Sequence, residues 1–170
     1  KGKEKSEWCR LWHLLEKISL RFPNLRIRLS SIEAAEARDD LIEVMKTHPL
    51  VAPHFHLCLQ SGSDEILRQM RRRYSRQGFI DRCERISNAL DRPGFSTDII
   101  IGFPGETDAD FDSTCDLSQK IGFFKMHLFP YSPREGTPAA SLKDPIPATV
   151  KLQRRKILEQ IEQENLQKYQ

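Results

Sequence analysis

The stretch Ser96-Thr-Asp-Ile-Ile-Ile-Gly-Phe-Pro-Gly-Glu-Thr107 decides the predicted fold. Its β-branched run ends in a Gly-Phe-Pro-Gly turn, and Thr107 with Asp110 has the spacing of a capping box that begins a helix. A strand, a tight turn and a helix in this order are typical of a βα unit. In parallel α/β folds, ligands bind at the carboxyl ends of the strands, where such turns lie. The turn is therefore a candidate ligand site, although an ordinary βα turn has the same features.

The rest of the chain repeats this pattern. Hydrophobic spacing of about 3.6 predicts helices over residues 8–18, 41–45, 66–70, 79–90 and 107–121, and from 149 onward. Alternation predicts strands over residues 25–30, 54–60, 96–101 and 124–131. Strands that alternate with helices indicate an α/β fold with a parallel sheet.

The predicted strands have one apolar and one polar face. The polar face carries Arg26, Arg28, Ser30, His54, His56, Cys58, Gln60, Ser96, Asp98, Lys125 and His127. Most parallel sheets are apolar on both faces, so these strands indicate the wall of a barrel with a polar lumen rather than a doubly wound sheet. A full barrel needs eight units, so four units predict an open arc or a piece of a longer chain. The polar residues either form a site or pair with one another, for instance Asp98 with a histidine or an arginine.

Composition limits the class of protein. The 170 residues are 38% hydrophobic and 30% charged, which is typical of a soluble globular domain, and no apolar run approaches the roughly 18 residues that span a bilayer. The cysteines are scattered at Cys9, Cys58, Cys83 and Cys115. This scatter predicts a reduced, intracellular protein without a disulfide framework. His54 and His56 share a strand face, but no carboxylate pattern accompanies them, so we expect no metal ligands.

The segment Arg68–Arg76 contains five arginines and no acidic residue. It follows a predicted strand and so lies on the ligand-binding side of a barrel. Arginines suit phosphate and a tyrosine can stack on a base, so RNA contact is one interpretation, and a solvated helix end is the other. The candidate RNA-binding residues are Arg71, Arg72, Arg73 and Tyr74. Glu106 either receives a substrate amine or is a first-turn acid that the helix dipole favours.

Five blocks, in this order, resemble the radical S-adenosylmethionine methylthiotransferases. They are Arg26-Ile-Arg-Leu-Ser-Ser-Ile-Glu33, His54-Phe-His-Leu-Cys-Leu-Gln-Ser-Gly62, Met70-Arg-Arg-Arg-Tyr74, the opening stretch, and Phe129-Pro-Tyr-Ser-Pro-Arg-Glu-Gly-Thr-Pro138. The first two blocks are most similar to the threonylcarbamoyladenosine tRNA methylthiotransferases. The isopentenyladenosine and ribosomal-protein branches usually have other residues there.

The resemblance implies an incomplete (βα) barrel of the radical SAM type, a partial TIM barrel. Residues 1–170 would be its C-terminal portion, with about four βα units. The resemblance also implies a cytoplasmic, monomeric transferase that uses S-adenosylmethionine and 4Fe–4S clusters, with no membrane partner. This enzyme would add a methylthio group to threonylcarbamoyladenosine in tRNA, with an electron donor that the motifs do not identify.

The family's cluster motif C-x-x-x-C-x-x-C is absent from these residues. The clusters would therefore be bound by other parts of a full-length protein, and we expect the isolated chain to be inactive. Two alternatives stay open. One is the same chemistry on an isopentenyladenosine tRNA or a ribosomal protein, and the other is a non-catalytic RNA- or partner-binding domain.

The family's cofactor site, transferred by motif, falls on strand ends and turns of this sequence. The residues so implied are Gln60, Ser61, Asp98, Gly102, Gly105, Glu106, Phe129, Tyr131 and Ser132. Gln60 and Ser61 would face the ribose, the turn from Gly102 to Glu106 would lie along the adenosine, and Phe129 to Ser132 would approach the adenine. The resemblance assigns no catalytic residue.

Overall fold

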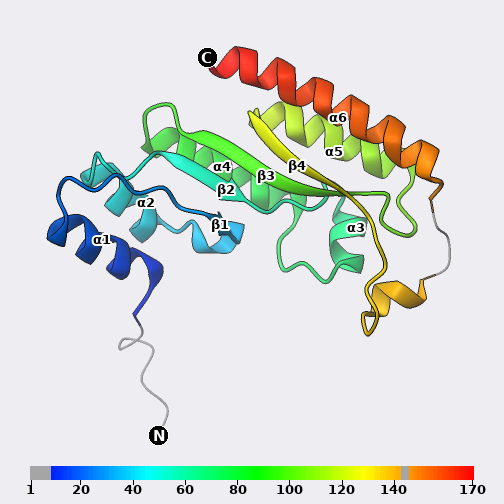
Figure 1. Cartoon of the computed structure of the whole chain (residues 1–170), viewed down its shortest axis with the longest axis horizontal. Helices are drawn as coiled ribbons and strands as arrows, with labels where there is room; N and C mark the ends of the chain where they lie inside the picture. Colours follow the sequence, from blue (N-terminus) through cyan, green and yellow to red (C-terminus); the bar gives the residue numbers. More distant parts are fainter. Residues whose placement is uncertain (1–8, 143–145) are drawn as a thin grey trace, which may run out of the picture.

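The structure is a computed structural model that describes residues 9–142 and 146–170. Four strands form one sheet in chain order: β1 (Ser31–Ile32), β2 (His54–Leu57), β3 (Gly94–Ile101) and β4 (Lys125–Pro130). Each strand pairs with the next in parallel. Within the described residues the sheet does not close on itself, so the structure is an open arc (Figure 1). The predicted partial (βα) barrel is confirmed.

Helices connect and cover the strands. They are α1 (Leu11–Arg21), η2 (Ala34–Glu36), α2 (Asp39–Thr47), α3 (Asp64–Gln69), α4 (Arg76–Ala89), α5 (Asp108–Ile121), η3 (Pro138–Ser141) and α6 (Ala148–Tyr169). Figure 1 shows α4 and α5 behind the sheet, and α6 runs beside α5 and past β4. No helix in the described part of the chain is long and apolar enough to cross a membrane.

The predicted strand over residues 25–30 is wrong. Only Ile27 pairs there, in a single bridge with Val51, and the strand itself is the two-residue β1. The pairing shifts by one residue between the bridge Ile27↔Val51 and the pair Ser31↔His56. Pro53 lies inside this shift, and a proline has no amide hydrogen to donate to a ladder. The segment 25–30 therefore cannot continue its pairing with the segment around Val51 beyond Pro53. Leu25, at the start of this segment, is 49% exposed.

The helix starts follow local chemistry. Thr107 caps α5 as predicted: its Oγ1 accepts the Asp110 N–H at 3.2 Å, and Asp110 Oδ2 accepts the Thr107 N–H at 3.0 Å. Ser63 caps α3 in the same way and also donates its hydroxyl to Asp110 Oδ1 at 2.5 Å. The first helix begins at Leu11; residue 8, which the pattern placed on it, lies outside the described residues.

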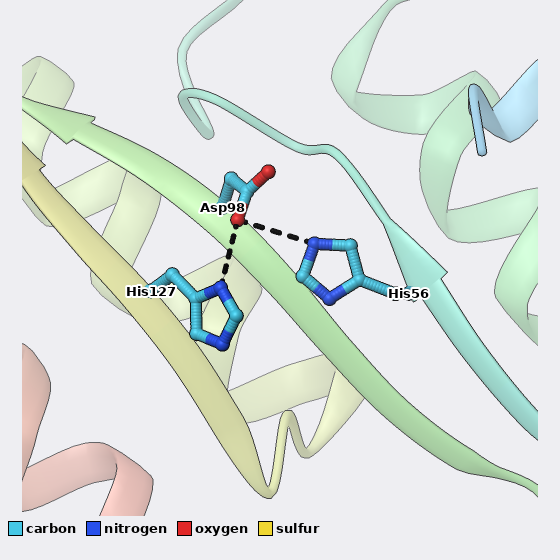
Figure 2. Close-up of side chains that lie close together, drawn as sticks. All are labelled: His56, Asp98 and His127. Carbon is cyan, nitrogen blue, oxygen red and sulfur yellow. Dashed lines mark ion pairs between the residues drawn. The ribbon is translucent and has the colours of Figure 1, made fainter. Parts of the chain in front are cut away.

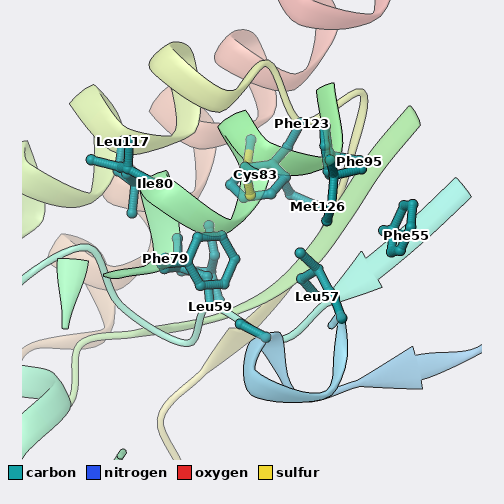
Figure 3. Close-up of a cluster of buried hydrophobic side chains, with 14 of the residues drawn as sticks. Phe55, Leu57, Leu59, Phe79, Ile80, Cys83, Phe95, Leu117, Phe123 and Met126 are labelled. Atoms are coloured by element: carbon teal, nitrogen blue, oxygen red, sulfur yellow. The ribbon is translucent and has the colours of Figure 1, made fainter. Parts of the chain in front are cut away.

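The hydrophobic core lies between the sheet and the helices α2, α4, α5 and α6. Alternate residues of the strands point into it, including Phe55, Leu57 and Leu59 from the segment of β2 and Phe95 from β3 (Figure 3). Because side chains alternate along a strand, the opposite residues face the other side of the sheet. Because the apolar face of the sheet packs against the helices, its polar face points toward the lumen of the arc.

Candidate functional site

A cavity of about 630 Å³ lies at the carboxyl ends of β2, β3 and β4. Its lining residues are Gln60, Gln69, Met70, Arg71, Arg72, Asp98, Ile100, Phe103, Phe129, Pro130, Tyr131, Ser132, Arg134, Thr137, Pro138 and Ala139. This volume is in the range of about 300–1,000 Å³ that is typical of small-molecule sites. The location is the one that parallel α/β folds use for ligands.

One wall of the cavity is aromatic. The rings of Phe103 and Tyr131 meet edge to face, with centroids 5.3 Å apart. Lys151 of α6 fixes this wall from behind, because its Nζ donates to the Tyr131 carbonyl at 3.1 Å. The Tyr131 hydroxyl is buried and has no hydrogen-bond partner among the described residues. The wall therefore offers apolar area to a ligand.

Two lining residues have left-handed backbone conformations. Gln60 has φ of 66° and Arg71 has φ of 57°, a region that residues other than glycine seldom adopt. Gln60 is held there by β3, since its N–H donates to the Asp98 carbonyl at 2.8 Å and its carbonyl accepts the Ile100 N–H at 2.9 Å. Strain of this kind is concentrated at functional sites.

Three arginines line the cavity: Arg71, Arg72 and Arg134. Glu33 accepts a hydrogen bond from Arg72 Nη1 at 3.0 Å. Guanidinium groups bind carboxylate and phosphate through paired, charge-assisted hydrogen bonds. This side of the cavity consequently suits an anionic group.

Below the cavity, the polar residues of β2, β3 and β4 pair with one another. Ser96 Oγ lies 2.9 Å from both His54 Nε2 and His56 Nδ1. Asp98 Oδ1 lies 3.1 Å from His56 Nε2 and 3.3 Å from His127 Nδ1 (Figure 2). Burial, and then the charge of the Arg28 guanidinium, lower the pKa of His54 to about 4. The pairing of Asp98 with histidines was one of the two interpretations of this face.

The structure places Ser61, Gly102, Gly105 and Glu106 outside the cavity lining. Ser61 is fully buried, and its hydroxyl oxygen accepts the Ser63 N–H at 3.2 Å. The Glu106 carboxylate accepts the Gly102 N–H at 2.9 Å and pairs with the Arg154 guanidinium. Burial raises the pKa of Glu106, while Gly102 and Arg154 oppose that shift. The cofactor-binding roles expected for these residues stay predictions.

Of the residues expected to contact RNA, Arg71 and Arg72 line the cavity, whereas Arg73 and Tyr74 do not. The Tyr74 hydroxyl donates to the carbonyls of Cys58 at 2.7 Å and Leu59 at 3.0 Å. Burial raises the pKa of this hydroxyl. Tyr74 thus supports the segment after β2, and base stacking by Tyr74 stays a prediction.

Phe103 and Pro130 lie within the ranges that the resemblance implied, whereas the sequence did not single out the following lining residues: Gln69, Met70, Ile100, Arg134, Thr137, Pro138 and Ala139. Most of these residues lie inside the blocks that carry the family resemblance. The blocks as a whole could therefore have indicated them, although no single residue did. Gln69 had no such signal. Gln69 is the last residue of α3, and this helix end lies beside the cavity.

The described cysteines do not form a site for an iron–sulfur cluster. Cys83 is 2% exposed in the core on α4, Cys115 is on α5, and Cys58 is on the polar face after β2. Cys9 is exposed before α1. A cluster needs several thiolates in one place, and these four come from separate elements.

Comparisons with known proteins agree with this geometry. The sequence model of the radical SAM superfamily matches residues 6–118. A tRNA-2-methylthio-N(6)-dimethylallyladenosine synthase of Mycobacterium marinum is 48% identical over 76% of this chain and 24% of its own length. Threonylcarbamoyladenosine tRNA methylthiotransferases are 37% identical over 91% of the chain in Thermotoga maritima and 40% identical over 83% in Bacillus subtilis.

The chain spans 35% of the Thermotoga relative and 32% of the Bacillus relative. These relatives share with it the segment that forms the sheet, the cavity and the arginine-rich connection after α3. A match of the superfamily model over more than half of the chain, on a parallel (βα) arc, shows the family. The chain belongs to the radical SAM superfamily.

Proposed function

We propose that this chain is part of a tRNA methylthiotransferase that acts on N6-threonylcarbamoyladenosine by radical SAM chemistry. The observation that carries the proposal is the cavity at the strand ends, whose lining combines an aromatic wall with three arginines. The relatives with this segment are named as tRNA-modifying methylthiotransferases of two kinds. The activity, cofactors and tRNA partner of the whole protein are part of the proposal.

The cavity fits the adenosine part of S-adenosylmethionine. Phe103, Tyr131 and Phe129 supply aromatic and apolar area for an adenine, and the backbone after β4 supplies polar atoms beside it. Reductive cleavage of S-adenosylmethionine supplies the radical chemistry when the cofactor is bound.

The chain's own residues would position the cofactor and exclude water. Gln60 presents its side chain to the cavity from a backbone fixed by two hydrogen bonds to β3. Lys151 and Tyr131 tie α6 to the strand end that forms the aromatic wall. The described cysteines do not fit a 4Fe–4S cluster, so no step is assigned to them.

The arginines favour threonylcarbamoyladenosine over dimethylallyladenosine. The threonylcarbamoyl substituent carries a carboxylate, whereas the dimethylallyl substituent is apolar. Arg71 and Arg134, with Arg72 beside them in its pair with Glu33, would bind such a carboxylate or a tRNA phosphate, whereas an apolar substituent would offer these arginines no anionic partner. The same chemistry on dimethylallyladenosine is the second candidate, because a relative of that kind is 48% identical. In the proposal the enzyme is cytoplasmic and monomeric.

Nucleoside analysis tests the proposal. The gene that encodes this chain would be deleted, and bulk tRNA would be digested and analysed by mass spectrometry. We expect loss of 2-methylthio-threonylcarbamoyladenosine with the unmethylthiolated nucleoside retained. Loss of the 2-methylthio-dimethylallyl nucleoside instead would support the second candidate. Retention of both methylthio nucleosides would contradict a role in tRNA methylthiolation.

A further inference from the structure

Three side chains from three neighbouring strands converge below the cavity: His56 of β2, Asp98 of β3 and His127 of β4 (Figure 2). Their candidate ligand atoms all lie within 4.8 Å of one another. The strand register explains the convergence, since Asp98 is directly opposite His127 and His56 is opposite Ser96, one step away on the same face. Asp98, which the alternation placed on the same polar face, is therefore the carboxylate that lies beside the two histidines.

The spacing fits a shared metal ion. Asp98 Oδ1 lies 3.1 Å from His56 Nε2 and 3.3 Å from His127 Nδ1. Nitrogen and oxygen ligands bind zinc at about 2.0–2.2 Å, so neighbouring ligand atoms that share one ion are roughly 2.8–3.6 Å apart, the shorter values for octahedral and the longer for tetrahedral geometry. The two observed separations fall in that interval.

A second observation points to a ligand between these groups. The side chain of His56 is 8% exposed, and its Nε2 makes no hydrogen bond of acceptable geometry with any described residue, although Asp98 Oδ1 is close. Buried polar atoms without a partner are rare in folded proteins. The other ring nitrogen, Nδ1, lies 2.9 Å from Ser96 Oγ. A hydrogen bond on one ring nitrogen is what fixes a metal-binding histidine and leaves the other nitrogen free for the ion.

We propose that His56 Nε2, Asp98 Oδ1 and His127 Nδ1 bind one divalent first-row transition-metal ion, such as Zn²⁺ or Fe²⁺. Two imidazoles and one carboxylate suit these ions, whereas Mg²⁺ and Ca²⁺ prefer oxygen ligands alone. Three protein ligands leave at least one coordination position open.

The proposed ion is accessible. Asp98 lines the cavity, and the side chain of His127 is 50% exposed, so a water molecule or a polar group of a bound ligand can reach the ion. Cys58 is the other nearby donor, and its Sγ lies 3.4 Å from Asp98 Oδ2. This thiol donates to Oδ2 of Asp98, whereas both histidines approach Oδ1, so the proposed ligand set is the three residues whose atoms converge.

Zn²⁺ binding to the purified 170-residue chain tests the site. The chain would be titrated with Zn²⁺ in competition with a chromophoric chelator, and we expect one ion bound per chain. His127→Gln and Asp98→Asn should each weaken binding by more than the 10- to 100-fold that loss of an outer hydrogen-bond partner typically costs. Ser96→Ala, which removes the partner of His56 Nδ1 and also a contact to His54 but none of the three proposed ligands, should weaken it by 10- to 100-fold. His48→Gln is the matched control, because His48 lies at the end of α2 away from the cluster, and should bind as the wild type.

The experiment distinguishes a variant that has lost Zn²⁺ binding from one that has failed to fold. His127 is half exposed and Asp98→Asn keeps the size of the side chain, so circular dichroism should show both variants folded. Failure of the wild type to bind Zn²⁺ would overturn the site, and so would equal affinity of wild type, His127→Gln and Asp98→Asn. The readout needs neither S-adenosylmethionine nor tRNA, so its failure is distinct from failure of the proposed function.

Discussion

Arg154 of α6 and Glu106 of the turn before α5 form an ion pair in which the two side chains are 7% and 2% exposed. Arg154 also donates to Asp108 at 2.8 Å and lies over the ring of Phe111. Glu106 in turn accepts the Gly102 N–H. One buried arginine thus fixes the Gly-Phe-Pro-Gly turn against the last helix, and this turn leads into the cavity at Phe103.

Arg154→Leu should destabilise the fold. Removal of one partner of a buried pair leaves an unpaired charge and typically costs about 3–5 kcal/mol of unfolding free energy. Urea denaturation measures this cost, and Glu106→Gln in the Arg154→Leu background should recover a large part of it. The control is Arg155→Leu, which breaks an exposed pair with Glu159 and should cost less than about 1 kcal/mol. Equal losses in Arg154→Leu and Arg155→Leu would contradict a structural role for the buried pair.

Gly62→Ala should also be destabilising, because a Cβ at this position would lie 2.5 Å from the Ser113 carbonyl oxygen and from Thr114 Cα. These are backbone atoms of α5 and cannot rotate away, so we expect a loss of about 1–3 kcal/mol or more. Gly122→Ala is the comparison. Gly122 has φ of 73° and open space around it. Gly122→Ala should therefore lose only the about 1–2 kcal/mol of unfolding free energy that a left-handed conformation costs a residue with a Cβ. A smaller loss for Gly62→Ala than for Gly122→Ala would show that the turn can move away from α5.

The fold was predictable from the sequence because strand and helix patterns alternate with clear turn chemistry, as at Thr107 and Asp110. The first strand was not, because its pairing depends on Pro53 in a neighbouring segment rather than on its own alternation. The cavity was predictable to the extent that Gln60, Tyr131 and the arginines lie in recognisable blocks. The alternation placed His56, Asp98 and His127 on one polar face, but not the convergence of these three side chains, since that depends on the register between three strands, which no single segment specifies.

Stability should fall in mild acid because of His54. Its pKa is about 4 in the folded protein and 6.5 when unperturbed, so the unfolded chain binds more protons between these values. The contribution is fully present above pH 6.5 and is lost as the pH falls toward 4, by about 3 kcal/mol at most. Denaturation midpoints measured from pH 7 to 4 should show this fall. His54→Gln removes the titrating group, so the unfolding free energy of this variant should change less with pH between 7 and 4. An unchanged pH dependence would assign the effect to other groups.

Cys58 should become more reactive when Asp98 is neutralised. The carboxylate accepts the thiol hydrogen bond and raises the pKa of Cys58, so Asp98→Asn should lower that pKa and increase the thiolate fraction. Alkylation by iodoacetamide at pH 8.5, followed by peptide mass spectrometry, should show a several-fold faster reaction at Cys58. The exposed Cys9 should react at the same rate in both proteins. An unchanged rate at Cys58 in Asp98→Asn would mean that the thiol does not depend on this carboxylate, and a slower rate would contradict the predicted direction.

The most direct test of the proposed function is whether the cavity at the strand ends binds the adenosine part of S-adenosylmethionine. The measurement is a titration of the ¹⁵N-labelled chain with S-adenosylhomocysteine, followed by amide chemical shifts. The account predicts saturable shifts at cavity residues such as Gln60, Tyr131 and Ser132, with α1 unchanged, and loss of these shifts when Arg134→Ala and Tyr131→Leu are combined. The absence of shifts at saturating ligand, or shifts confined to residues outside the cavity, would contradict it.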